Sequence, residues 1–220
     1  PWKGRRGRRV PVRFVHGGRT QRKDPFMSTS TTAQPVKAIV LRGGVTGLVA
    51  GAAMATFALV ASVTYQHHGF FTPLFHISAL FGSPDSLMRS GMEAMAGNKF
   101  WFSAGPAVLG LMIHMMTGAM FGIGFAFLAR RLPRTLLIPA GAVYGLAVFV
   151  VSAFVGLPVA AKITGPGDVI SDMASMVGWA TFAVEHMMFG LVLGAIAWRT
   201  TPADSPAAEV RGARSAMLSR

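Results

Sequence analysis

Two histidines occupy the same position of a repeated string, His-Met-Met-x-Gly-x-x-x-Gly, in two strongly apolar stretches of the chain. The first copy begins at His114 and the second at His186. An ionisable side chain inside a membrane span is expensive, so two at matching positions indicate a shared site or a shared packing solution. Imidazole binds haem iron and other metal ions and exchanges protons near neutral pH. These histidines are therefore the first candidates for chemistry.

One interpretation makes His114 and His186 the axial ligands of a haem b held between two helices. Glycines beside each histidine would let the flat macrocycle approach the helix backbones. In drawing a haem ligand from each of two helices, the chain resembles membrane cytochromes b, although one histidine per helix allows at most one such haem. The alternative is that each imidazole hydrogen-bonds to Thr, Ser or a backbone carbonyl, and that the glycines serve only close packing.

Glu185 directly precedes His186, and Ile113 stands at the equivalent place of the first copy. A carboxyl group beside an imidazole inside the membrane could form a proton relay or a cation site, as in a small proton-linked transporter or channel. Consecutive helical residues point about 100° apart, however, so the two side chains would not share one direction. The alternative is that Glu185 is neutralised by a partner such as Thr, Tyr144 or His114.

A second group of histidines follows the first apolar stretch: His67, His68 and His76. Three methionines come after them at helical spacing, within a short surface helix predicted over 85–98. Imidazole and thioether ligands together could bind copper or zinc. The spacing follows no established ligand motif, and histidines in this aromatic segment also fit an amphipathic role at the lipid headgroups. The methionines are Met88, Met92 and Met95.

The elements that must position these residues are membrane-spanning helices. Hydrophobic residues make up 52% of the 220 residues and charged residues 13%, and the mean hydropathy is +0.48. This composition is far from that of soluble proteins. Cysteine is absent, which excludes disulfides, iron–sulfur clusters and thiolate metal sites. We expect an all-α bundle over 43–199 in a lipid bilayer, with spans of about 20 residues at 44–65, 105–128, 136–157 and 176–198.

The distribution of lysine and arginine predicts the orientation of the bundle. Eighteen of the 21 lie in the two tails and the short 129–135 loop, and three lie in the other two connections. Positive charge stays on the cytoplasmic side, so both termini should be cytoplasmic. The basic tail over 1–42 would attract anionic lipids, and residues 1–26 are interpreted as either part of it or a non-native extension. The sequence contains no nucleic-acid-binding motif. The C-terminal tail over 200–220 is expected to be disordered.

Glycine pairs spaced four apart recur in all four spans and predict helix packing sites. The pairs open the first and third spans and follow the histidines of the second and fourth, so their order indicates an internal duplication of a two-helix unit. The duplication would place both histidines about 15 Å from the same membrane face, near the bilayer centre. The pairs are Gly43 and Gly47, Gly118 and Gly122, Gly141 and Gly145, and Gly190 and Gly194.

These features together resemble uncharacterised four-helix bacterial inner-membrane proteins of the YagU type, over about 40–200. The resemblance rests on the Gly-rich first span, a histidine early in the second and the end of the third at Gly156-Leu157-Pro158. The outer loops depart from that pattern. The family implies a bacterial inner-membrane protein with no assigned catalytic residues. The chain also lacks a phosphate loop, nucleophile elbow or catalytic-triad pattern.

We therefore expect a non-enzymatic structural or accessory subunit of a membrane assembly, either as a homo-oligomer or with other membrane subunits. The alternatives are a haem-binding redox subunit that uses His114 and His186, and a small proton-linked transporter or channel that uses Glu185 and the same histidines.

Overall fold

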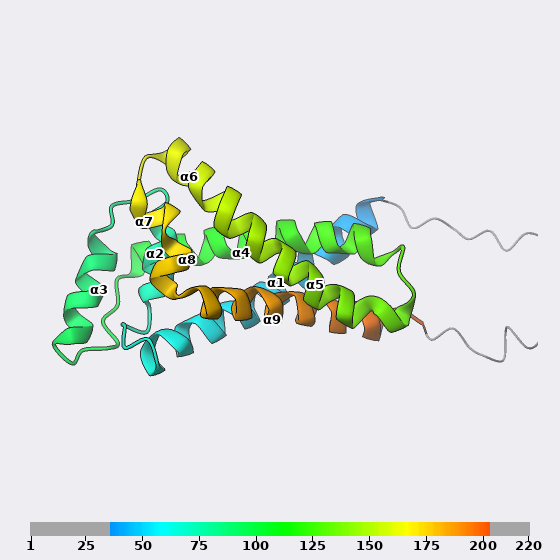
Figure 1. The fold of residues 1–220 in the computed structure, drawn as a ribbon, viewed down its shortest axis with the longest axis horizontal. Helices are drawn as coiled ribbons and strands as arrows, with labels where there is room; N and C mark the ends of the chain where they lie inside the picture. The colour runs from blue at the N-terminus through cyan, green and yellow to red at the C-terminus, as the bar shows by residue number, and fades with distance from the viewer. Residues whose placement is uncertain (1–35, 203–220) are drawn as a thin grey trace, which may run out of the picture. The chain divides into compact units, whose positions relative to one another are not determined.

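A computed structural model describes residues 36–202, and four long apolar helices make up most of them (Figure 1). Each is long and apolar enough to cross a membrane, and these residues contain no strand, so the predicted four-span, all-α fold is confirmed. The tails before residue 36 and after residue 202 lie outside the described residues. The spans are α1 (Val36–Thr64), α4 (Ala104–Ala129), the Arg134–Thr164 helix and α9 (Trp179–Thr200).

The third span is longer than the sequence predicts. It continues past residue 157 to Thr164 and consists of four consecutive segments. A proline inside a helix lacks one backbone N–H, and its ring presses on the preceding turn. The π-helical segment widens the turn just before Pro158, and the helix continues. The segments are η1 (Arg134–Leu136), α5 (Leu137–Val151), η2 (Ser152–Gly156, π-helical) and α6 (Leu157–Thr164).

Two other boundaries differ from the prediction. Residues 36–42, assigned from the sequence to the basic tail, belong to α1, and lysine or arginine at a span end can extend toward the headgroups. At the fourth span, α9 begins at Trp179 rather than 176. Gly178 has a φ of 92°, a conformation that favours glycine, and it separates α9 from the short helix α8 (Met173–Val177).

The spans pack as two tight pairs, α1 with α4 and α5 with α9. α1 and α9 join the pairs, whereas α4 and α5 touch only sparsely. Glycine allows the close approach, since a methyl group at Gly47 would overlap the Gly118 carbonyl oxygen. A methyl group at Gly145, the equivalent position, would overlap the His186 carbonyl oxygen. The register differs by one turn, since the residue equivalent to Gly118 is Gly190, which Gly141 meets instead. Close packing at glycine recurs in both pairs, and the internal duplication stays a prediction.

One end of the bundle, called the capped end below, carries short helices (Figure 1). They are α2 (Thr72–Ser78), α3 (Asp85–Met95), α7 (Asp168–Ser171) and α8. α2 packs against α4 at Gly110, where a methyl group would overlap the carbonyl oxygen of Leu74. The aromatic segment after the first span thus folds back onto the bundle, and α2 contributes to the wall of its interior at this end.

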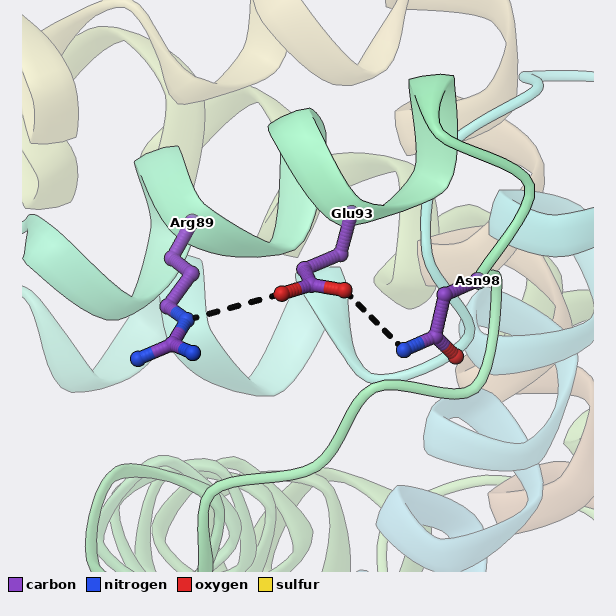
Figure 2. Close-up of polar contacts among 3 residues, drawn as sticks. All are labelled: Arg89, Glu93 and Asn98. Atoms are coloured by element: carbon purple, nitrogen blue, oxygen red, sulfur yellow. Dashed lines mark hydrogen bonds and ion pairs between the residues drawn. The ribbon is translucent and has the colours of Figure 1, made fainter.

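α3 confirms the surface helix predicted around 85–98, with its regular part over Asp85–Met95. The polar contacts that Figure 2 shows on this helix are local, whereas the Ser90 hydroxyl shares a hydrogen bond of 2.8 Å with Thr72 of α2. The Glu93 carboxylate forms an ion pair with Arg89 at 3.7 Å and accepts a hydrogen bond from Asn98 Nδ2 at 3.0 Å. The charged groups of α3 therefore stabilise the helix and its exit loop, and none of the three lines the interior of the bundle.

Candidate functional site

The interior of the bundle contains a cavity of about 330 Å³. All four spans and three of the short helices at the capped end contribute to its walls. Most of the lining consists of apolar side chains and glycine, including Met54, Ile113 and Phe189. The polar lining residues are Gln66, His76, His114, Thr117, Ser152, Glu185 and His186.

Both histidines of the repeated string line this cavity, but they make different hydrogen bonds. His114 Nε2 donates across to the carbonyl oxygen of Gly51 on α1 at 3.0 Å. His186 Nδ1 donates to the Phe182 carbonyl oxygen at 2.7 Å, one turn earlier on its own helix. A carbonyl oxygen only accepts, so each of these nitrogens must carry the proton. The structure therefore brings the two residues together at one cavity and gives each a backbone partner.

The hydrogen bond of His114 weighs against the haem interpretation, whereas that of His186 uses Nδ1 and leaves Nε2 free. A haem with two axial histidines needs a free ring nitrogen from each. His114 uses Nε2, the nitrogen farthest from its helix, for the Gly51 carbonyl. Releasing it would give up this hydrogen bond, typically about 0.5–1.5 kcal/mol, while the Gly51 carbonyl keeps the backbone N–H of its own helix. The geometry favours the alternative, in which the imidazoles hydrogen-bond to the backbone.

Glu185 has none of the partners expected from the sequence. Its side chain is 5% exposed, and no hydrogen bond or ion pair joins it to another residue of the 36–202 range. The Tyr144 hydroxyl instead donates to the Phe121 carbonyl oxygen at 2.7 Å, and His114 is bonded to Gly51. The expected neutralising hydrogen bond to Tyr144 or His114 is thus wrong, because both groups donate to backbone carbonyl oxygens instead.

The carboxyl oxygens of Glu185 must reach open space. Within the described residues, every fully enclosed side-chain nitrogen or oxygen atom has a hydrogen-bond partner. Glu185 has none and lines the cavity, so the cavity is the space its carboxyl group meets. Glu185 and His186 line it together, although we expected them to point in different directions. The cavity is broad enough to extend across both positions of α9.

The histidines near the capped end are divided between the cavity and the surface. His76 is buried, and its Nε2 donates to the Val169 carbonyl oxygen on α7 at 2.6 Å. Burial lowers the pKa of His76, the Val169 hydrogen bond opposes this shift, and the charge of His68 adds to it. His67 and His68 are exposed. No group of three or more His, Asp or Glu residues able to hold a metal ion occurs in residues 36–202.

The exposure of lining residues on α4 and the third span indicates that the cavity opens sideways between these two helices. Met120 and Val151 line it and are also 60% and 48% exposed. The two helices touch sparsely there, and Ser152 and Gly156 of the π-helical segment border the opening. Such segments are frequent at functional sites. A molecule dissolved in the hydrocarbon region could therefore enter without crossing the capped end.

The sequence pattern identified His114, Glu185 and His186, but it did not reveal several other parts of the site. It did not predict that Gln66 and Ser152 line the cavity, or that α2 carries His76 into its wall. Pro158 is the sequence signal that could have indicated a widened turn near Ser152. No comparable signal places α2, because its position depends on the fit of Leu74 against Gly110.

The fold and the cavity define a class, a four-span membrane protein with an interior site. No family model matches this chain, and no curated protein or solved structure was found to be similar to it. The resemblance to the YagU-type proteins stays a prediction, and the function must be argued from the geometry of the cavity.

Proposed function

We propose that this protein is a multi-pass protein of the bacterial inner membrane that binds a small, mainly apolar molecule inside its bundle. The observation that carries the proposal is the cavity of about 330 Å³ among the four spans. Sites for small molecules typically enclose about 300–1,000 Å³, with mostly apolar walls and a few polar groups. The side opening toward the hydrocarbon region suits a ligand that dissolves in lipid.

The polar groups of the cavity favour binding over catalysis. A nucleophile must lie within hydrogen-bond reach of the base that activates it. His76, His114 and His186 all donate to backbone carbonyls, and the Thr117 hydroxyl donates to the Ile113 carbonyl. A non-enzymatic role, including that of an accessory subunit resembling the YagU-type proteins, agrees with this arrangement.

A fluorescent probe tests the proposal. The probe is 1-aminoanthracene, a small apolar molecule whose emission rises in an enclosed apolar site. We expect saturable binding to the protein in lipid nanodiscs, above the background of empty nanodiscs. Ala58 lines the cavity on α1, and the Ala58→Trp side chain would fill part of it. Ala52 is exposed on the same helix and lies outside the cavity lining.

We expect Ala58→Trp to weaken probe binding by about tenfold or more, since an indole occupies much of the space. Ala52→Trp should leave it unchanged. Far-UV circular dichroism checks that both variants keep their helix content, and Ala160→Phe fills the cavity from the third span as a second blocking variant. Equal binding by all variants, or no binding above empty nanodiscs, would contradict the proposal.

A further inference from the structure

The hydrogen bonds around the cavity leave it rich in acceptors and poor in donors. His76, His114 and His186 each donate from one ring nitrogen to a backbone carbonyl oxygen. In a neutral imidazole the other ring nitrogen carries no proton and can only accept. The three histidines therefore add acceptor atoms, and no free N–H donor, to this site.

The other polar lining groups follow the same trend. Gln66 Nε2 donates to the Val177 carbonyl oxygen at 2.7 Å, and Thr117 donates to Ile113 at 2.9 Å. No lysine or arginine is among the described residues that line the cavity. Ser152 contributes a hydroxyl group, which can donate or accept. The cavity thus lacks a cationic group and has few unused donors.

Glu185 adds the one acidic side chain of the lining. It is 95% buried, since its exposed fraction is 5%, and it has no partner within residues 36–202. A carboxylate in apolar surroundings is stabilised only by an opposite charge or by hydrogen-bond donors. The protein supplies neither at this point, so a bound molecule that brings a positive charge and N–H donors would complete the site.

From these observations we propose that the cavity binds an organic ammonium ion, a protonated amine on a compact apolar body, with the ammonium group on the Glu185 carboxylate. This inference deepens the proposed function and rests on it. The apolar walls contact the body, while Glu185 and the free imidazole nitrogens accept the N–H donors. The side opening, bordered by Met120 and Val151, is the route by which such a lipid-soluble amine enters.

Three molecules that share one apolar cage test this inference. They are 1-aminoadamantane, which is cationic at neutral pH, 1-adamantanol, which is neutral, and 1-adamantanecarboxylate, which is anionic. Each is titrated against bound 1-aminoanthracene, a neutral reporter, in nanodiscs that contain the full chain. A charge-assisted hydrogen bond should make the amine displace the reporter at least about tenfold more effectively than the alcohol.

The variant Glu185→Gln keeps the size of the side chain and removes the charge. It should lose the preference for the amine and still bind the alcohol and the reporter. Glu185→Asp keeps a carboxyl group with a shorter reach and should retain part of the preference. This partial rescue separates recognition of the ammonium group from a general effect on folding.

The outcomes separate the two proposals. If the reporter binds but the amine and alcohol compete equally, the cavity is a binding site and the ammonium inference is wrong. A stronger effect of the carboxylate would also overturn it, because the histidines would then act as cationic donors. If neither the reporter nor any of the three cages binds, the proposed function itself fails.

Discussion

Replacing Gly47 by alanine should separate α1 from α4 and destabilise the bundle. A Cβ atom at Gly47 would lie 2.9 Å from Ala119 Cα and 3.0 Å from the Gly118 carbonyl carbon, and it would overlap the Gly118 oxygen. These neighbours are backbone atoms, so no side-chain rotation relieves the overlap. The helices themselves must move apart.

The size of the effect follows from these distances. Carbon atoms attract best at about 3.5–4.0 Å, so a contact of 2.9 Å requires a separation of about 0.6 Å or more. Overpacking of this kind typically costs about 1–3 kcal/mol. Alanine also forms helix better than glycine by about 1 kcal/mol, which partly masks the loss.

Gly44→Ala is the matched control, because it gains the same helix propensity on the same helix. A Cβ atom at Gly44 would meet only side-chain carbons of Ile123, at 3.9 Å. The propensity gain cancels between the two variants, so Gly47→Ala should be about 1–3 kcal/mol less stable than Gly44→Ala. The free energy of unfolding is measured in mixed micelles by titration with dodecyl sulfate, followed by far-UV circular dichroism.

Gly145→Ala extends the comparison to the second pair of helices. Its Cβ atom would lie 3.0 Å from Met187 Cα and overlap the His186 carbonyl oxygen. A similar loss at both positions agrees with equivalent packing in the two pairs. Equal stability of Gly47→Ala and Gly44→Ala would refute the argument that backbone contact at these glycines holds the pairs together.

Three further predictions concern the capped end, the opposite end and the orientation. Burial holds the pKa of His76 below 6.5, so the unfolded form binds a proton more readily than the folded form, and stability falls as the pH drops below about 6.5. Amide-exchange protection of 168–171 should therefore decrease between about pH 7.5 and pH 5.5, and His76→Asn should abolish that dependence. Arg134 Nε donates to the Trp198 carbonyl oxygen at 3.0 Å, and the Arg134 guanidinium lies 4.4 Å from the centre of the Trp198 ring. Arg134→Ala should therefore reduce amide-exchange protection near the end of α9 by about 1–2 kcal/mol. Arg131 is exposed, and Arg131→Ala, the control, should leave this protection unchanged. The chain has no cysteine, so a single introduced cysteine reports the side of the membrane on which it lies. With both termini cytoplasmic, Asn98→Cys should react with an impermeant maleimide in intact cells, and Arg131→Cys should react only after permeabilisation. The reverse pattern would contradict the predicted orientation.

The four spans could be predicted from the sequence because length and hydropathy are local properties of a segment. The errors occurred where local patterns compete with backbone geometry. Pro158 indicated an end to the third helix, but the π-helical turn before it lets the helix continue to Thr164. Gly178 ended the preceding helix two residues beyond the predicted start of the fourth span, because its positive φ breaks the helical path.

The repeated string and the residue before its second copy fix the positions of His114, Glu185 and His186 along their helices. Helical periodicity then determines the direction in which each side chain leaves its helix. It did not determine their partners. His114 reaches a carbonyl on α1, His186 one on its own helix, and Glu185 none in the described range. Those contacts depend on how closely segments far apart in the sequence approach each other. Glycine packing sets this distance within each helix pair, and the sparse contact of α4 with α5 leaves space between the pairs. Only the tertiary structure therefore brings these three polar residues, whose burial costs free energy, to the wall of one cavity.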